Sequence, residues 1–267
     1  MTKKHMNIPI YQVDAFSDTP FGGNPAAVCI LDSWLADDVM QKIGQENNLS
    51  ETAFIVRKSN AEYEIRWFTP STEINLCGHA TLASAYVVFH FIDKNIDKVS
   101  FNSKSGVLSV DKNDDILTLD FPSTPPKEDE VPLVLIKALG VIPEAAFSSR
   151  DLLVVVKDEE TVRSLNPDFN LLKELDYIGI IVTAKGDNSD FVSRFFAPNV
   201  GINEDPVTGS AHTTLIPFWA EKLNKSILHA YQVSSRKGEL WCELKGDRVK
   251  IAGKACLILQ GELTINN

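Results

Sequence analysis

Four titratable side chains have neighbours and spacing that suit acid–base or metal chemistry. Glu51 begins an apolar stretch, and a carboxylate among apolar neighbours loses hydration, which favours its protonated form and suits proton transfer. Cys77 and His79 lie two residues apart and together offer two metal ligands. Asp205 precedes Pro206, where an acidic residue is also an ordinary helix cap. By residue type alone, Glu51 is a solvated glutamate at a strand entry and His79 is a core histidine.

Metal and cofactor chemistry receive little support from the sequence. Zinc takes at least three ligands from a protein, and no third ligand recurs at a suitable spacing near Cys77 and His79. The chain contains no GxGxxG fingerprint, Walker loop or GxSxG elbow, which argues against the common cofactor-dependent and hydrolase classes. We therefore expect no metal and no cofactor.

An internal repeat indicates the elements that position these residues. Residues 66–77 and 194–205 align without a gap, with Arg, Phe, Pro, Ile and Asn at matching positions. Both segments follow an apolar strand and lead into a stretch of small residues. The alignment places Cys77 opposite Asp205, and it predicts two similar halves that arose by duplication.

Each repeat segment leads into a predicted helix. Residues 79–89 are apolar on nearly all sides, which is typical of a helix inside a core. The second helix, residues 207–216, is also small and apolar, and Pro217 predicts a kink or a break at its end. The first turn of a helix offers unpaired backbone N–H groups, so we expect residues 78–80 and 208–210 to bind an anion such as a carboxylate.

The strand patterns between these helices predict an α+β fold in two halves. Alternating apolar residues mark half-buried strands, and the proline-rich residues 121–126 with the acidic segment after them indicate an interdomain connection. We expect residues 1–121 to form an N-terminal half with Glu51 and His79. Residues 122–267 then form a C-terminal half with Asp205 and Ser210, the last strand being free to pack back on the first half.

Composition narrows the classes of partner. The formal net charge is −10 and Lys and Arg form no stripe, so nucleic acids and membranes are poor partners. The longest apolar run, residues 80–92, is too short to span a membrane, and no secretory signal follows the first lysines. The four cysteines are scattered without CxxC spacing, which predicts reduced thiols in a cytoplasmic protein.

Several segments together resemble the signature motifs of PhzF-like (phenazine biosynthesis-like) proteins. These segments are NLSETAF at 48–54, CGHAT at 77–81, EDPVTGSAH at 204–212, VDAF at 13–16, FGGNPAAV at 21–28 and GKA at 253–255. The resemblance covers about residues 10 to 262. It implies a diaminopimelate-epimerase-like fold, in which two similar halves each curl a mostly antiparallel sheet around a central helix, with the active site in the cleft between them. By analogy with the family, we also expect a homodimer.

The resemblance also assigns roles to residues. It makes Glu51 the general acid/base of a cofactor-independent isomerase that shifts a proton on a small carboxylate-bearing metabolite. Glu51 has no duplicate, because the aligned position lies near Gly179. His79 is expected to shuttle or orient a proton, and Asp205 to act as a carboxyl shared with the substrate. The expected substrate-binding residues are Asn24, Gly78, Ala80, Thr208, Gly209 and Ser210, of which Asn24 equally suits a structural turn.

Two alternatives stay open. Diaminopimelate epimerase and proline racemase look similar but use one cysteine in each half, whereas this alignment pairs Cys77 with Asp205. An amino-acid racemase or epimerase would therefore need Asp205 to replace a thiol. The other alternative is a small-metabolite-binding protein without turnover, for which an acid/base such as Glu51 is not needed.

Overall fold

The computed structural model describes residues 5–266, and the chain divides into two compact units. The first unit runs to Asp120 and includes the chain again from Gly253 onward, and the second is Phe121–Ala252. The last strand, expected in the second half but free to pack back on the first, belongs to the first unit. None of the helices within residues 5–266 has the length and apolar character needed to cross a membrane.

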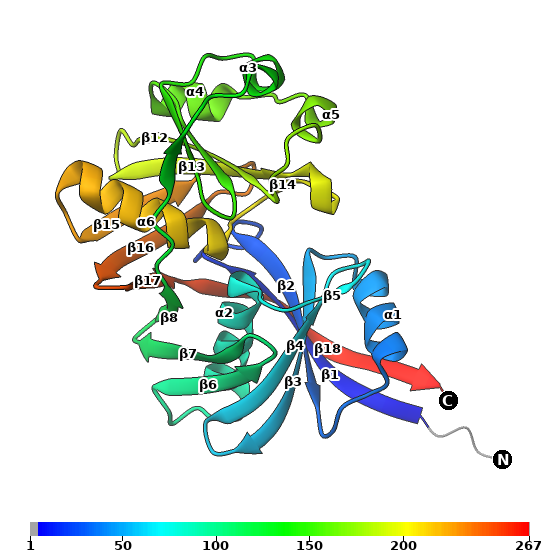
Figure 1. The fold of residues 1–267 in the computed structure, drawn as a ribbon. Helices are drawn as coiled ribbons and strands as arrows, with labels where there is room; N and C mark the ends of the chain where they lie inside the picture. The colour runs from blue at the N-terminus through cyan, green and yellow to red at the C-terminus, as the bar shows by residue number, and fades with distance from the viewer. Residues whose placement is uncertain (1–4, 267) are drawn as a thin grey trace. The chain divides into compact units, whose positions relative to one another are not determined.

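The first unit is built on one mostly antiparallel sheet (Figure 1). Its elements are β1 (His5–Ala15), β2 (Asn24–Leu31), α1 (Asp37–Asn47), β3 (Glu51–Ser59), β4 (Glu62–Phe68), β5 (Glu73–Ile74), α2 (Gly78–Val87), the π-helical turn η1 (Val88–Ile92), β6 (Lys98–Ser103), β7 (Gly106–Asn113), β8 (Ile116–Pro122) and β18 (Ala255–Asn266). The strands follow the order β18-β1-β2-β3-β4-β6-β7-β8, and β5 pairs with β4. The pairs β2–β3 and β4–β6 are parallel.

Helices cover the sheet of the first unit from two sides. Helix α2 packs against β1, β2 and β3, and its residues are buried almost throughout, as its lack of a polar face predicted. Met40 and Ile43 of α1 pack with Phe54 and Phe68 in a separate apolar cluster. The start of α2 is therefore held firmly beside the first residues of β2 and β3.

The second unit repeats this plan. Its elements are β9 (Lys127–Asp129), α3 (Leu133–Leu139), β10 (Ala145–Ser148), β11 (Leu152–Val155), α4 (Glu159–Ser164), α5 (Phe169–Leu172), β12 (Ile180–Lys185), β13 (Phe191–Ala197), the 3-10 helix η2 (Pro198–Val200), β14 (Ile202–Asp205), α6 (Gly209–Leu223), β15 (Ile227–Gln232), β16 (Gly238–Lys245) and β17 (Arg248–Gly253). The strand order is β9-β10-β11-β12-β13-β15-β16-β17, and β14 pairs with β13. The parallel pairs, β11–β12 and β13–β15, are the counterparts of β2–β3 and β4–β6. The duplication predicted from the sequence is confirmed by this shared topology.

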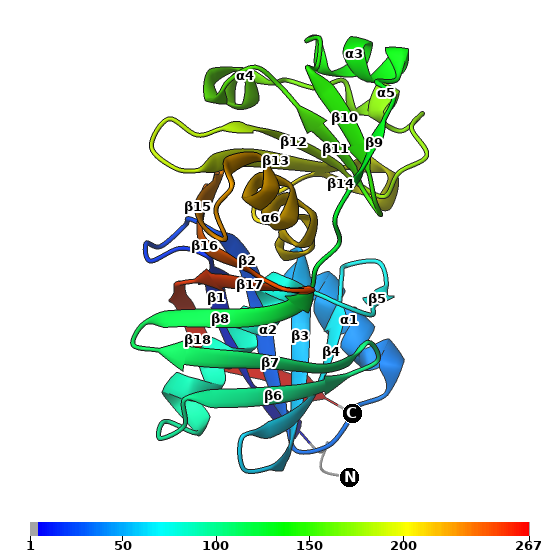
Figure 2. The ribbon, with the colours of Figure 1, turned by 60° about the vertical axis from the view of Figure 1, so that its left-hand side comes forward.

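Figure 2 shows α6 on one face of β12 and β13 and the short helices α3 to α5 on the other. On the α6 face, the rings of Phe191 and Trp219 stack with centroids 5.8 Å apart. On the opposite face, Leu135 of α3 and Val162 of α4 pack in one apolar cluster with Val182. Strand β9 occupies part of the segment that the sequence analysis had interpreted as a connection, so that interpretation is wrong for residues 127–129.

Helix α6 continues through Pro217 to Leu223, so the expected break does not occur. A proline inside a helix removes one N–H donor, which leaves the carbonyl four residues earlier without its helical partner. That carbonyl belongs to Thr213, and it accepts a hydrogen bond from the backbone N–H of Thr124 at 2.9 Å. The loop before β9 therefore satisfies the acceptor that Pro217 leaves free.

The strand registers define equivalent residues in the two units. The β3–β4 and β12–β13 registers are related by an offset of 128 residues, which makes Gly179 the counterpart of Glu51, as predicted. The offset then changes, because Trp67 pairs with Ile74 whereas its counterpart Phe195 pairs with Asp205. The first pair members differ by 195 − 67 = 128 and the second by 205 − 74 = 131. The gap-free alignment is thus wrong beyond β13, where the segment that contains η2 is three residues longer than its counterpart in the first unit.

The corrected equivalence changes the partner of Cys77. Cys77 is the N-cap residue of α2 and Thr208 is the N-cap residue of α6, so these two residues correspond, rather than Cys77 and Asp205. The same offset of 131 relates Glu73 to Glu204. Glu73 forms an ion pair with Arg66 at 2.7 Å, and Glu204 forms one with Arg194 at the same distance. The repeated ion pair supports the corrected register.

Candidate active site

The first unit brings Glu51 and His79 together in a buried pair. Glu51 is the first residue of β3 and His79 the second residue of α2, and their exposed fractions are 6% and 4%. Nε2 of His79 lies 2.9 Å from Oε2 of Glu51. Glu51 is therefore not the solvated residue that its type alone indicated. Both groups can gain or lose a proton, and water has little access to either.

Two further groups contact the other side of the imidazole. Nδ1 of His79 lies 3.1 Å from Nδ2 of Asn24, the first residue of β2, and 3.6 Å from Sγ of Cys77. In the neutral ring, the amide nitrogen, which only donates, makes Nδ1 the acceptor and leaves the ring hydrogen on Nε2, the nitrogen nearest to the Glu51 carboxylate. Asn24, expected either to bind substrate or to form a turn, thus orients His79.

Burial and neighbouring charge act in opposite directions on His79. Burial lowers the pKa of its imidazole, whereas the sulfur of Cys77 and the carboxylate of Glu51 raise it, and the net result is a pKa well above the usual value. Burial also raises the pKa of Cys77 to about 11, so Cys77 is a neutral thiol at neutral pH. We therefore attribute the raised pKa of His79 chiefly to the Glu51 carboxylate.

The same cluster corrects the argument made against a metal. The sequence offered only Cys77 and His79, but the fold adds Glu51, and one ligand atom from each of the three lies within 4.8 Å of the others. A sulfur, a nitrogen and a carboxylate oxygen suit a soft divalent cation such as Zn²⁺. Both the thiol and Nε2 would first have to lose a proton to bind it. The spacing argument was therefore incomplete, because the third candidate ligand comes from another strand.

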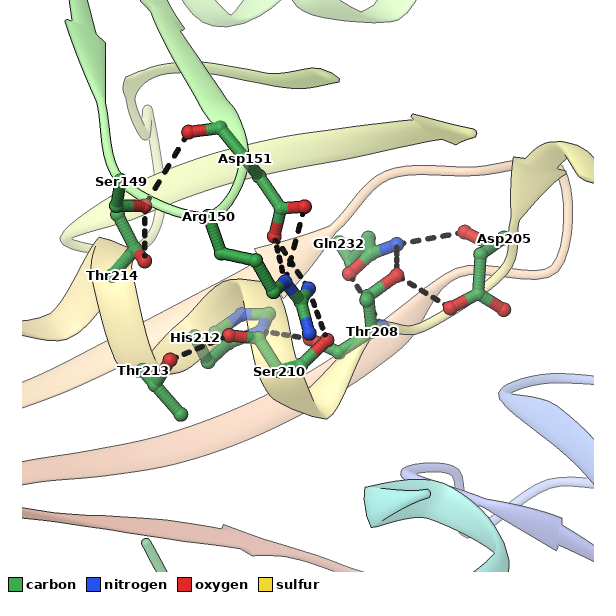
Figure 3. A network of polar contacts seen from close by, with 10 residues as sticks. All are labelled: Ser149, Arg150, Asp151, Asp205, Thr208, Ser210, His212, Thr213, Thr214 and Gln232. Carbon is green, nitrogen blue, oxygen red and sulfur yellow. Dashed lines mark hydrogen bonds and ion pairs between the residues drawn. The ribbon is translucent and has the colours of Figure 1, made fainter. Parts of the chain in front are cut away.

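A second polar cluster occupies the start of α6 in the second unit (Figure 3). Oγ1 of Thr208 donates to Oδ2 of Asp205 at 2.6 Å. The side-chain amide of Gln232 donates to the backbone oxygen of Asp205 and accepts from the backbone N–H of Thr208, both at 2.8 Å. Helix α6 begins at Gly209, so Asp205 does not cap it. Thr208 commits its hydroxyl proton to Asp205 and makes no cap to the helix either.

Ser210 joins a further pair that the sequence analysis missed. Its Oγ accepts a hydrogen bond at 2.9 Å from Nη2 of Arg150, whose guanidinium also binds the buried carboxylate of Asp151 (Figure 3). Burial raises the pKa of Asp151, although Arg150 acts in the opposite direction. Arg150 and Asp151 immediately precede β11, and no motif or repeated residue in the sequence pointed to them.

The predicted site residues thus fall into two groups. Asn24, Glu51 and His79 meet in the first unit, where Gly78 and Ala80 flank His79 in the first turn of α2. In the second unit, Asp205 bonds Thr208 at the end of β14, and Gly209 and Ser210 form the first turn of α6. Cys77, Arg150, Asp151 and Gln232 are the polar neighbours that the sequence analysis did not assign to a site.

Comparison with known proteins gives a consistent family. The sequence profile of the phenazine biosynthesis-like protein family matches residues 13–261. The chain is 53% identical to an uncharacterized isomerase from Pseudomonas aeruginosa, over 98% of this chain and 100% of the relative. The crystal structure of a PhzF family protein from Enterococcus faecalis superposes with a TM-score of 0.95 at 51% identity, covering 97% of this chain and 99% of the other.

More distant structures share the fold alone. A hydroxyproline epimerase from Agrobacterium vitis superposes with a TM-score of 0.66 at 9% identity, over 98% of this chain and 93% of the other. The two α+β halves are thus those of the diaminopimelate-epimerase-like fold. Both the profile and the high identity over nearly the whole length carry the assignment: this chain belongs to the PhzF, or phenazine biosynthesis-like, family.

Proposed function

We propose that this protein is a cofactor-independent isomerase that moves a proton on a small carboxylate-bearing metabolite, with Glu51 as the general acid/base. The observation that carries the proposal is the buried Glu51 carboxylate 2.9 Å from Nε2 of His79. A positioned carboxylate with restricted access to water is the group such a reaction needs. Relatives named as isomerases support the same class of reaction.

In the proposed reaction, Glu51 first removes a proton from a carbon of the substrate. The C–H bond breaks, its electron pair moves into the adjacent unsaturated system, and an O–H bond forms on the carboxyl group. Glu51 then returns the proton to a different carbon, so the double bond shifts and no oxidant or reductant is consumed. His79 holds the carboxylate through Nε2, and Asn24 fixes the ring by its contact with Nδ1. Cys77 remains a thiol at neutral pH and takes no proton in this scheme.

We also propose that the first turn of each buried helix is suited to binding a carboxylate. In α6, the side chain of Thr208 donates to Asp205 and makes no cap hydrogen bond to the first turn, which begins with Gly209 and Ser210. In α2, Gly78 and Ala80 offer the corresponding backbone groups. Asp205, which already accepts a short hydrogen bond, is the carboxyl group proposed to contact the substrate's own acid group.

The test is proton exchange with and without the Glu51 carboxylate. Candidate carboxylates are incubated with protein in heavy water, and deuterium uptake at carbon is followed by NMR. Glu51→Gln keeps the size of the side chain but cannot take up a proton, so exchange should fall at least about a hundredfold. The matched control is Glu62→Gln, an exposed glutamate at the start of β4, which should exchange like the wild type.

The outcomes separate the alternatives. Exchange without net racemisation supports isomerisation, whereas equilibration of enantiomers identifies a racemase or epimerase. Cys77 corresponds to Thr208, so a two-thiol racemase lacks its second thiol. Wild-type exchange in Glu51→Gln would exclude Glu51 from the mechanism. Binding of a carboxylate without exchange in either protein would identify a metabolite-binding protein.

A further inference from the structure

Arg150 occupies, in the second unit, the place that corresponds to the Asn24–His79 corner of the first. Ala26 pairs with Glu51 across β2–β3, and Leu152 pairs with Ile180 across β11–β12. Because Gly179 corresponds to Glu51, these registers make Asp151 correspond to Ala26. Arg150 then corresponds to Pro25. The offset of 131 makes Ser210 the counterpart of His79. In both units, a residue at or shortly before the start of the inner strand contacts the second residue of the buried helix.

The guanidinium of Arg150 is held in one orientation, but one of its nitrogens remains available for a ligand. Its Nε lies 3.2 Å from both carboxylate oxygens of Asp151, and its Nη2 donates to Oδ2 of Asp151 and to Oγ of Ser210 (Figure 3). Within residues 5–266, the part of the chain that the structure describes, Nη1 makes no hydrogen bond or ion pair. The side chain is 45% exposed, whereas that of Asp151 is 1% exposed. One edge of the guanidinium therefore faces the protein and the other is available to a ligand.

The contact with Ser210 also determines what that hydroxyl can do. Oγ of Ser210 accepts from Arg150, so its own proton is free to be donated. Arg150 and Ser210 thus offer two adjacent donors, Nη1–H and Oγ–H, from side chains whose positions are fixed by Asp151. The rotamer freedom of a long arginine side chain is already lost before a ligand binds, which favours affinity.

We propose that Arg150 is a specificity-determining residue that binds a carboxylate of the substrate through Nη1, together with the hydroxyl of Ser210. This inference rests on the proposed function, because it names the group by which the substrate is recognised. Asp151 offsets the charge of the guanidinium, so the pair suits a planar monoanion. A phosphate dianion gains less there because Asp151 repels it. The held guanidinium places Nη1 beside the Ser210 hydroxyl, so each carboxylate oxygen can meet one donor, a geometry that lysine does not reproduce.

Binding of simple carboxylates to the whole chain tests the proposal. Acetate, succinate and glutarate are titrated by calorimetry, with inorganic phosphate as the competing anion. Arg150→Gln should weaken carboxylate binding by about ten- to a hundredfold, as expected for a charge-assisted hydrogen bond, and Arg150→Lys should restore only part of it. The control is Arg57→Gln, since Arg57 forms a similar half-exposed pair with Asp93 in the first unit and should leave affinity unchanged.

Two further measurements keep the test decisive. Arg150→Gln leaves the Asp151 carboxylate buried without its partner, so the double variant Arg150→Gln/Asp151→Asn removes that charge and should fold while still binding weakly. In the exchange assay, Arg150→Gln should raise KM and leave kcat nearly unchanged, whereas Glu51→Gln should abolish exchange and leave carboxylate affinity intact. Unchanged affinity in both Arg150 variants, tighter binding of phosphate than of any carboxylate, or absence of carboxylate binding by the wild type would overturn the proposal. Loss of exchange in Glu51→Gln would still support the proposed reaction in that case.

Discussion

The two units place a buried carboxylate at the same corner of the same fold but give it different partners. In the first unit, Glu51 contacts His79, an imidazole that can take up or release a proton. In the second, Asp151 contacts Arg150, which stays protonated at any pH at which the protein is folded. A carboxylate beside an imidazole can transfer a proton, and a carboxylate beside a guanidinium can only hold a charge in place. Duplication followed by this exchange of partners suits one unit to chemistry and the other to anion binding.

The packing around Gly179 shows why the second unit has no copy of Glu51. A Cβ atom at position 179 would lie 2.1 Å from Cζ of Phe195, so the ring fills the space that a side chain would need. The backbone N–H of Gly179 instead supports the carboxylate of Asp151 on the neighbouring strand. The acidic group of the second unit has therefore moved one strand over, from the position of Glu51 to that of Ala26.

Introducing a carboxylate at position 179 should cause the largest loss of stability. Gly179→Glu buries a charge without a partner and overlaps Phe195, and an uncompensated buried charge costs about 3–5 kcal/mol. Gly179→Ala adds only the overlap and should cost about 1–3 kcal/mol. Urea unfolding measures both. Gly261→Ala on β18 is the control, because a Cβ atom there would lie 3.8 Å from the nearest other atom. It should change the free energy of unfolding by less than about 0.5 kcal/mol.

The overlap with Phe195 can be separated from the other effects of adding a side chain. Gly179→Ala combined with Phe195→Leu removes the ring that the new methyl group meets, so part of the loss should be recovered relative to Phe195→Leu alone. Full stability of the single Gly179→Ala variant would show that the ring does not reserve this space. The comparison between the two units would then lose its steric basis.

Two buried histidines, His212 and His79, should give the protein opposite dependences on pH. His212 of α6 is buried and donates from Nδ1 to the backbone oxygen of Thr208, and burial lowers its pKa to about 4. Below its unfolded pKa of about 6.5, the unfolded chain binds a proton that the native protein does not, so stability falls with pH between about 6.5 and 4. The difference of about 2.5 units, at 1.36 kcal/mol each, amounts to about 3 kcal/mol. His212→Gln should remove this acid-dependent loss.

In the first unit, His79 should change the stability with pH in the opposite direction. Its pKa is raised in the native protein, so its contribution to stability is fully present below about pH 6.5 and is lost as the pH rises through the native pKa. His79→Gln should therefore flatten the alkaline side of the stability curve, and His212→Gln the acidic side. Urea midpoints measured from pH 4 to 9 give both slopes. Parallel curves for the wild type and His212→Gln below pH 6.5 would contradict the prediction.

The sequence predicted those features that depend on local pattern. The all-apolar helix after Cys77, the duplicated strands and the absence of a second Glu51 follow from residue order alone, and the structure bears them out. The offset change at η2 could not be seen, because a three-residue insertion falls where matching Ile and Asn residues conceal it. The contact between Glu51 and His79 depends on strand pairing across separate segments, which only the family resemblance indicated.

Partners that lie far apart along the chain were the ones missed. Arg150 and Ser210 are 60 residues apart, and Gln232 and Thr208 are 24 apart, so no spacing rule links them. The proline in α6 was interpreted from helix propensity, but its cost is reduced by a donor from Thr124, a distant loop residue. In each case, a tertiary contact decided the outcome that local chemistry had left open.

The amide of Asn24 should tune the proton affinity of His79. Asn24→Asp places a second carboxylate against Nδ1, which favours the imidazolium and should raise the pKa of His79 further. The charged ring then holds the Glu51 carboxylate more strongly, so exchange should fall by about tenfold, less than the loss expected for a positioned acid/base. NMR titration of the imidazole protons and the pH profile of exchange measure the two effects. Asn102→Asp, at a half-buried asparagine on β6, is the control, and an unshifted His79 titration in Asn24→Asp would contradict this role.

The repeated arginines offer the finest comparison of the two units. Arg66 and Arg194 each form a two-pronged pair with a glutamate, Glu73 and Glu204, and each guanidinium lies over the ring of a phenylalanine two residues later at 5.2 and 4.9 Å. A lysine keeps the charge but cannot form both bonds, so each Arg→Lys change should cost about 1 kcal/mol.

Each arginine has a third hydrogen-bond partner, and this partner should make the stability losses of Arg66→Lys and Arg194→Lys differ. Nη1 of Arg66 binds Asp37, whose side chain is 76% exposed and is readily solvated once the bond is lost. Nη1 of Arg194 instead donates to the backbone oxygen of Leu165 at 2.7 Å, and an acceptor in that partly buried position has less access to water. Leaving such an acceptor unsatisfied costs about 1–3 kcal/mol, so Arg194→Lys should destabilise the protein more than Arg66→Lys by roughly 1 kcal/mol. Urea unfolding of the two variants and of the double variant tests the difference, and the losses should add because the sites share no partner. A larger loss for Arg66→Lys would mean that the exposed ion pair, rather than the carbonyl contact, determines the strength of this repeated feature.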